Sequence, residues 1–143
     1  MIKSELMTLW NIESWTVEPH GVYFVSRRLD TKQVDKVETI TKSLNISCSG
    51  YTEAEMLSLT FWPQLYAKLD ELDQVAQEII QKEIPPDEPV VLKLTDIMLD
   101  TSGCYGTFAL GYDVGESTAG HLYVLVPFNE NFTAQQDVIY ETL

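Results

Sequence analysis

The sequence predicts an α+β fold in which a long bipartite helix packs on one face of an antiparallel sheet. Two observations carry this prediction: helical periodicity over residues 53–83, and short β-rich runs on both sides of that stretch. A length of 143 residues and a hydrophobic content of 45% are ordinary for one globular domain. We therefore expect a single domain over residues 1–143, with an N-terminal β-hairpin, the helix and a C-terminal β-meander.

The central helix is predicted in two segments. Its apolar positions recur at steps of three and four residues, which is typical of an amphipathic helix: Leu65, Leu69, Leu72, Ala76 and Ile79. Thr52 and Glu55 have the spacing of a capping box, which begins a first segment over residues 53–61. Pro63 suits a first helical turn because its missing N–H has no partner to lose. The second segment then covers residues 63–83, and the proline pair that follows ends it.

The chain before the helix predicts strands. Residues 22–26 form a β-rich run after a turn signal, and we expect this strand to pair antiparallel with residues 38–48. Residues 30–46 leave two interpretations open, since a helical spacing of apolar residues coexists there with strand alternation. The density of β-branched residues favours the strand. Residues 10–17 suggest one short strand or two broken ones.

The chain after the helix predicts a β-meander. Strands are expected at residues 90–95, 104–112 and 121–128, and the first slips in its alternation, which a bulge near Asp96 would repair. The stretch 113–120 is expected to be a flexible acidic connection. A short helix over residues 134–140 is expected to close the chain.

Charge is the one extreme of the composition. The formal net charge is −13, yet residues 1–50 hold six acids and six bases, so the surplus lies wholly in residues 51–143. Beyond Lys93 there is no lysine or arginine, and the last fifty residues carry −7. That half should repel nucleic acid and anionic membranes and attract a basic partner in a salt-dependent way. The other interpretation is that acidity maintains solubility.

The location is predicted to be cytosolic. Glu5 interrupts what would be the apolar core of a signal peptide, and no run approaches the roughly 20 apolar residues of a membrane span. Cys48 and Cys104 have no motif spacing and are expected to be two buried thiols.

The candidates for chemistry are few. His121 with Asp113 and Glu116 could form a metal site or a general base, and Asp96 with Asp100 could form a carboxylate pair. Neither group has the spacing of a metal or catalytic motif. We therefore expect no catalytic residue, no metal and no cofactor.

Several short motifs resemble those of small bacterial domain families, over roughly residues 20–128. The motifs are Thr52-Glu53-Ala54-Glu55, Thr95-Asp96-Ile97, Leu110-Gly111-Tyr112-Asp113 and Gly120-His121-Leu122-Tyr123-Val124. Some of these families have been proposed as immunity proteins, which bind and neutralise toxins encoded beside them. The resemblance implies a stoichiometric binder and carries over no catalytic residue.

The leading hypothesis is a non-catalytic protein-binding module whose acidic face binds a protein with a basic surface. The residues predicted to bind are Asp96, Asp100, Tyr112, Asp113, Glu116 and Tyr123. One alternative is a nucleic-acid mimic that occupies a basic DNA-binding protein. Another is an enzyme with a site at the 113–121 loop. A second copy of the chain also stays open as a partner.

Overall fold

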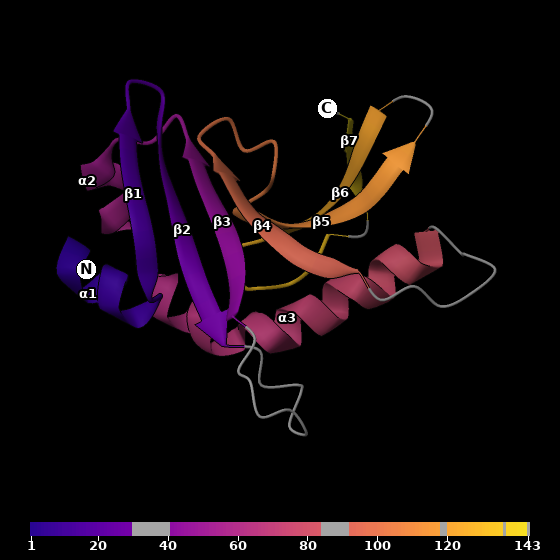
Figure 1. Cartoon of the computed structure of the whole chain (residues 1–143), viewed down its shortest axis with the longest axis horizontal. Coiled ribbons are helices and arrows are strands. Elements are labelled where there is room, and N and C mark those ends of the chain that lie inside the picture. The colour runs from indigo at the N-terminus through magenta and orange to yellow at the C-terminus, as the bar shows by residue number, and fades with distance from the viewer. Residues whose placement is uncertain (30–40, 84–91, 118–119, 136, 143) are drawn as a thin grey trace.

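The computed structural model describes residues 1–29, 41–83, 92–117, 120–135 and 137–142. Its described strands form one seven-stranded sheet in the sequential order β1-β2-β3-β4-β5-β6-β7 (Figure 1). Neighbouring strands are antiparallel except β3 and β4, which run parallel. A parallel pair needs a crossover connection, and two helices supply it here. The α+β class predicted from the sequence is confirmed.

The first half of the sheet follows a short helix. Helix α1 covers Lys3–Leu9 and was not expected from the sequence. Strands β1 (Ile12–Glu18), β2 (Gly21–Leu29) and β3 (Thr41–Ser49) then form an antiparallel meander. The predicted pairing of the second and third of these strands is confirmed. The sequence leaves residues 30–46 open between strand and helix. Of these, residues 30–40 lie outside the described residues.

The crossover is the bipartite helix. Helix α2 covers Glu53–Ser58 and begins with the predicted capping box. In that box the Glu55 amide donates to the Thr52 hydroxyl at 3.1 Å, and the Thr52 amide donates to the Glu55 carboxylate at 3.1 Å. Helix α3 covers Trp62–Glu83. Pro63 lies in its first turn, where a missing N–H costs no hydrogen bond.

The second half of the sheet contains β4 (Lys93–Asp100), β5 (Phe108–Ser117), β6 (Gly120–Phe128) and β7 (Ile139–Thr142). The predicted bulge near Asp96 is confirmed, since the register of β4 against β5 shifts between Leu94 and Asp96. Strand β5 begins later than predicted because residues 103–106 turn through glycines with φ of +79° at Gly103 and +67° at Gly106. It also ends later, so Asp113 lies in a strand and the predicted loop from that residue is wrong.

The predicted helix over residues 134–140 is wrong, because Ile139–Thr142 forms β7 at the edge of β6. A helix of two turns gains little by itself, whereas an edge strand satisfies its backbone groups on the sheet. The prediction of two buried thiols is half right. Cys48 is buried on β3, but Cys104 is exposed in the turn before β5.

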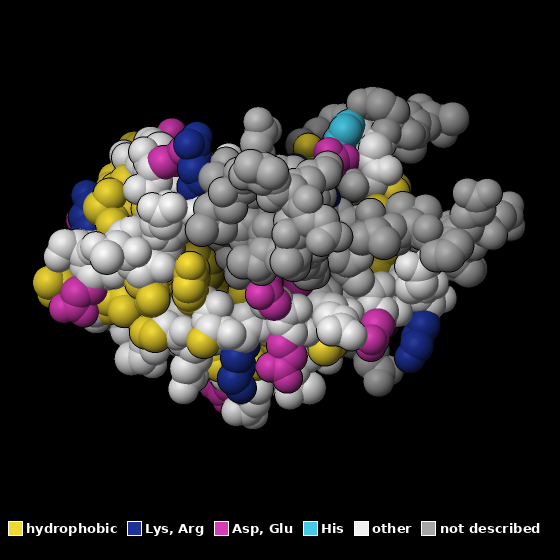
Figure 2. All heavy atoms as spheres, turned by 60° about the horizontal axis from the view of Figure 1, so that its bottom comes forward, with side chains coloured by type: hydrophobic (Ala, Val, Ile, Leu, Met, Phe, Trp, Pro, Cys, Tyr) yellow, Lys and Arg dark blue, Asp and Glu magenta, His cyan; other side chains and the backbone are white. Residues whose placement is uncertain are grey.

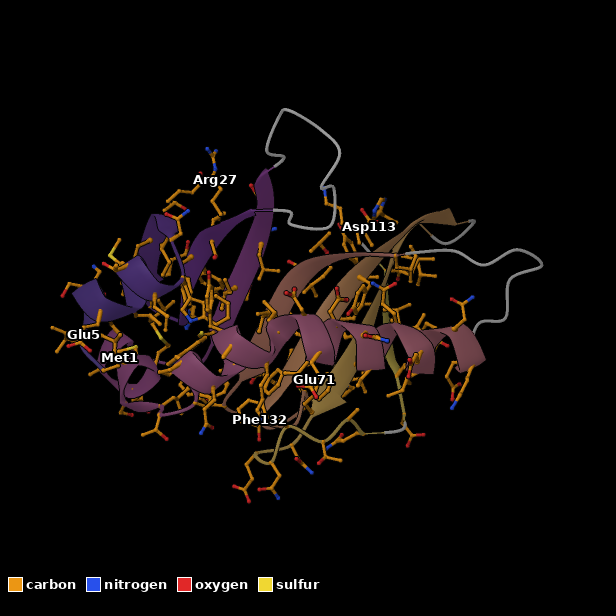
Figure 3. The ribbon with its side chains drawn as sticks, turned by 90° about the horizontal axis from the view of Figure 1, so that it is seen from below. Met1, Glu5, Arg27, Glu71, Asp113 and Phe132 are labelled. Atoms are coloured by element: carbon orange, nitrogen blue, oxygen red, sulfur yellow. The ribbon has the colours of Figure 1, made fainter. Side chains whose placement is uncertain are left out.

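One core joins the three helices to one face of the sheet. The strands contribute alternate side chains, such as Phe24, Ile46, Ile97 and Val124, all at most 2% exposed. The helices contribute Leu6, Met56, Trp62, Leu65, Leu69, Leu72, Ala76 and Ile80. Figure 3 shows α3 lying along the sheet, with Glu71 on the helix and Asp113 on β5 pointing to opposite sides.

Hydrophobic side chains also reach the surface near the first residues of the chain. Figure 2 shows them gathered toward the end of the molecule that carries α1 and α2. Met1 is 39% and Ile2 61% exposed there. Among the helices described, none is long and apolar enough to cross a membrane.

Candidate functional site

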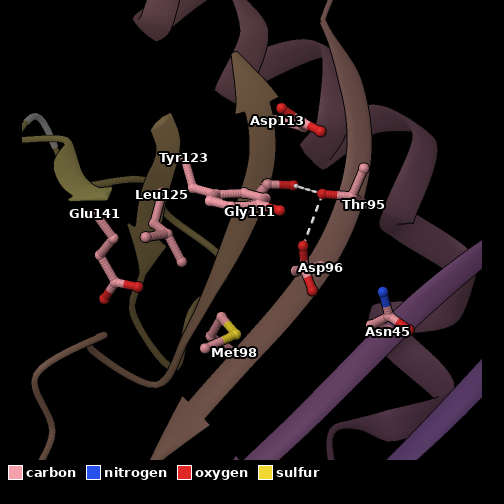
Figure 4. Close-up of a pocket in the computed structure, with 9 residues that line it drawn as sticks. All are labelled: Asn45, Thr95, Asp96, Met98, Gly111, Asp113, Tyr123, Leu125 and Glu141. Atoms are coloured by element: carbon pink, nitrogen blue, oxygen red, sulfur yellow. Dashed lines mark hydrogen bonds between the residues drawn. The ribbon is translucent and has the colours of Figure 1, made fainter. Parts of the chain in front are cut away.

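The side of the sheet opposite the core, called here the second face, carries the residues that alternate with the buried ones. It holds a pocket of about 310 Å³, called here the carboxylate pocket (Figure 4). The pocket is lined by Asn45, Thr95, Asp96, Met98, Gly111, Asp113, Tyr123, Leu125 and Glu141. These residues come from β3, β4, β5, β6 and β7, so the cavity joins a strand that precedes the helical crossover to four strands that follow it.

The floor of the pocket depends on Gly111. This residue is opposite Asp96 in the register of β4 and β5. A Cβ atom at Gly111 would lie 3.1 Å from the Asp96 Cβ and 3.6 Å from a methyl carbon of Leu125. The absence of a side chain at this position therefore keeps the cavity open between the two neighbours.

Asp96 is a partly buried carboxylate of the pocket. Its Oδ2 accepts a hydrogen bond of 2.7 Å from the Thr95 hydroxyl, which the bulge turns toward it (Figure 4). Burial raises the pKa of the Asp96 carboxyl, although hydrogen bonds from Thr95 and Asn45 oppose that shift, and the charge of Asp113 adds to it. The carboxylate is therefore oriented by its neighbours while its charge is poorly solvated.

Asp113 lies at a second register shift, between itself and Gly115. Its Oδ1 accepts a hydrogen bond of 2.9 Å from the Gly115 amide and lies 2.6 Å from the His121 Nε2. The His121 side chain is 30% and the Asp113 side chain 39% exposed. The imidazole ring also contacts the ring of Tyr123, with 5.0 Å between centroids. This pair forms one rim of the pocket.

Glu141 brings β7 to the opposite rim. Its Oε1 accepts a hydrogen bond of 2.6 Å from the hydroxyl of Tyr105, in the turn before β5. Burial raises the pKa of Tyr105, and the Glu141 carboxylate raises it further by bonding and charge, so the phenol stays a donor. The contact holds the edge strand against the turn.

The structure does not bring all the predicted binding residues together. Asp96, Asp113 and Tyr123 lie together in the carboxylate pocket. Asp100, at the end of β4, does not line the pocket. Its Oδ1 accepts a hydrogen bond of 2.9 Å from the Ser102 amide, and hydrogen bonds from Ser102 lower the pKa of its carboxyl. The Glu116 backbone is opposite His121, but its side chain lies outside the described part.

Tyr112 is a correction. The sequence suggested Tyr112 as an aromatic anchor for binding, but this side chain is fully buried on the helix side of the sheet. Its hydroxyl donates to the Asp73 Oδ1 at 2.5 Å and so links β5 to α3. Alternation along β5 places Tyr112 on the face opposite Asp113, so both cannot belong to one surface.

The remaining lining residues were missed by sequence reasoning. Asn45 reaches the pocket only because β3 and β4 pair in parallel, at the register Asn45 opposite Asp96. Glu141 was missed because its segment was predicted to lie beyond a helix. Among the described residues, no group of three or more His, Cys, Asp or Glu side chains could hold a metal ion.

Comparisons with protein-family models, with curated proteins and with solved structures find no match to this chain.

Proposed function

We propose that this protein is a non-catalytic binding module whose second face binds a basic protein. The observation that carries the proposal is the convergence of Asp96, Asp113 and Glu141 on one pocket. Carboxylates from three different strands are grouped there, in the half of the chain that holds the whole charge surplus. Desolvation of a carboxylate costs free energy, and a cation brought by a partner would recover it.

The distribution of charge supports an electrostatically guided encounter. The last fifty residues carry −7 and include Asp96, Asp113 and Glu141, the carboxylates among the described lining residues. A surface of one sign raises the association rate of an oppositely charged partner and does so less at high salt. An immunity protein that blocks the basic surface of a toxin is the partner relationship that this proposal favours.

The test is capture of partners from the native cells with three tagged proteins at low and high salt. The three proteins are the wild type and two variants that each remove three negative charges. The second-face variant combines Asp96→Asn, Asp113→Asn and Glu141→Gln, and the helix variant combines Glu71→Gln, Glu78→Gln and Glu83→Gln on exposed positions of α3.

We expect a basic protein to be retained at low salt by the wild type and the helix variant, and lost by the second-face variant. Equal loss from both variants would mean that total charge matters and the second face does not. Retention of the partner by the wild type and both variants would overturn the proposal.

A second candidate, an enzyme, is favoured by one specific observation. His121 and Asp113 are 2.6 Å apart at the rim of the pocket, which is the separation of a base and the carboxylate that orients it. A panel of chromogenic ester, phosphate and glycoside substrates tests this candidate. Turnover by the wild type that disappears in His121→Asn would favour the enzyme over the binding module.

A further inference from the structure

The carboxylate pocket combines negative charge with apolar walls. Asp96, Asp113 and Glu141 supply the charge, while Met98 and Leu125 supply apolar surface. Among the described residues that line the pocket, none is lysine, arginine or histidine. At the rim, His121 contacts Asp113, and the exposed Lys93 is opposite Asp113 in the register. Asp96 and Glu141 therefore face the cavity without a cation of the lining set.

The size of the pocket limits what it can hold. Pockets for whole drug-sized ligands begin at about 300 Å³, and this one is about 310 Å³. Such a space suits one long side chain better than a helix or a folded loop. A side chain with an apolar stem and a cationic end would match walls of this kind, because the stem covers Met98 and Leu125 while the end meets the carboxylates.

The geometry of the acceptors distinguishes arginine from lysine. The three carboxylates come from β4, β5 and β7, so they surround the cavity and do not share one direction. A guanidinium group presents five donors in one plane, whereas an ammonium group is a compact point charge. Guanidinium is also the more weakly hydrated cation and stacks on aromatic faces, and Tyr123 offers such a ring at the wall.

We propose that the carboxylate pocket receives an arginine side chain of the protein partner, with Asp96 as the innermost acceptor. This inference rests on the proposed function, since it names the group of the basic partner that enters the site. Asp96 is preorganised for the role because the Thr95 hydroxyl, at 2.7 Å from its Oδ2, already fixes the carboxylate. Gly111 leaves the space that the planar end of the side chain requires.

The experiment uses methyl NMR of the whole chain labelled at methionine. Met98 lines the pocket, and the fully buried Met56 lies in the core on the other side of the sheet, so the two report on binding and on global change. The probe is the capped tripeptide acetyl-Gly-Arg-Gly-amide. The same tripeptide with lysine, and with citrulline as the neutral isostere of arginine, are the matched ligands.

We expect the Met98 methyl signal to shift in a saturable way with the arginine peptide, more weakly with lysine and not with citrulline. Met56 should stay unchanged. Asp96→Asn should weaken binding of the arginine peptide about tenfold or more, because a partly buried negative charge is lost. Asp100→Asn is the matched control, since it removes the same charge from the same strand outside the pocket. The affinity of this variant for the arginine peptide should stay within about twofold of that of the wild type.

Two results would overturn the inference: no shift of Met98 at saturating arginine peptide, or an equal shift with citrulline. Its failure is separable from that of the proposed function. In one case the protein captures a basic partner through the second-face acids, but the arginine peptide does not shift the Met98 signal. That result would reject only the arginine site. A Met98 response to arginine in a protein that captures no basic partner would reject the binding module and leave a pocket for small guanidinium ligands.

Discussion

Replacing Tyr112 by phenylalanine should weaken the contact between α3 and the centre of the sheet without changing the second face. The hydroxyl is the only part removed, and it donates to the Asp73 Oδ1 at 2.5 Å. The ring is fully buried, and burial, together with the charge of Asp73, raises the pKa of the phenol, so it stays protonated as a donor.

The expected loss follows from the strength of this bond. A hydrogen bond to a charged group contributes about 1.5–3 kcal/mol. Asp73 keeps a second donor, the Gln77 side-chain amide at 3.1 Å, so the lower part of that range applies. We expect the free energy of unfolding to fall by about 1.5–2 kcal/mol, which corresponds to about 5–8 °C in Tm at about 3–4 °C per kcal/mol for a chain of this size.

Urea denaturation followed by circular dichroism measures this loss. Tyr140→Phe on β7 is the matched control, because Tyr140 is 50% exposed and the structure gives its hydroxyl no hydrogen bond to a described residue. That variant should stay within about 0.5 kcal/mol of the wild type. A loss below about 0.5 kcal/mol for Tyr112→Phe would mean that the bond to Asp73 does not stabilise the fold.

Three further variants or probes test other parts of the structure. Burial raises the pKa of Asp96 above the ordinary value of 3.8, so the folded state holds this proton more tightly than the unfolded state. Stability is therefore lost as pH rises from about 3.8 through the folded pKa. In urea titrations Asp96→Asn should be more stable than the wild type at pH 7 but not below pH 3.8. A disulfide-exchange reagent should label one thiol at once, at the exposed Cys104. The other, Cys48, is buried with a pKa raised to about 12, so it should react only in denaturant; two fast thiols would contradict its burial. Gly106→Ala should cost about 1–3 kcal/mol more than Gly103→Ala, since both have positive φ but only the Cβ at 106 would clash, at 2.7 Å from a backbone oxygen; equal melting curves would refute this.

The helical crossover could be predicted because its signals are local. The capping box at Thr52, the proline at the start of α3 and the periodic leucines all act within a few turns of one helix. The bulge near Asp96 was also visible, because a slip in alternation is a property of the strand itself.

The carboxylate pocket was only partly predictable because it depends on pairing between distant strands. Asp96, Asp113 and Tyr123 were found as acids and aromatics of the meander. Asn45 and Glu141 reach the pocket through the parallel register of β3 with β4 and through β7, which no local pattern indicated. Tyr112 was misplaced for a related reason: composition suggests aromatic anchors, but the face of each residue depends on register.

The central claim is that the position of the acids, and not their number, makes the second face a binding surface. The most direct measurement is the dissociation constant of the captured partner over a range of salt concentrations. It compares the wild type, the second-face variant and the helix variant. We predict that the helix variant keeps an affinity close to that of the wild type, while the second-face variant loses about a hundredfold or more at low salt and becomes nearly insensitive to salt. Equal weakening by the two variants, with equal salt dependence, would contradict the account.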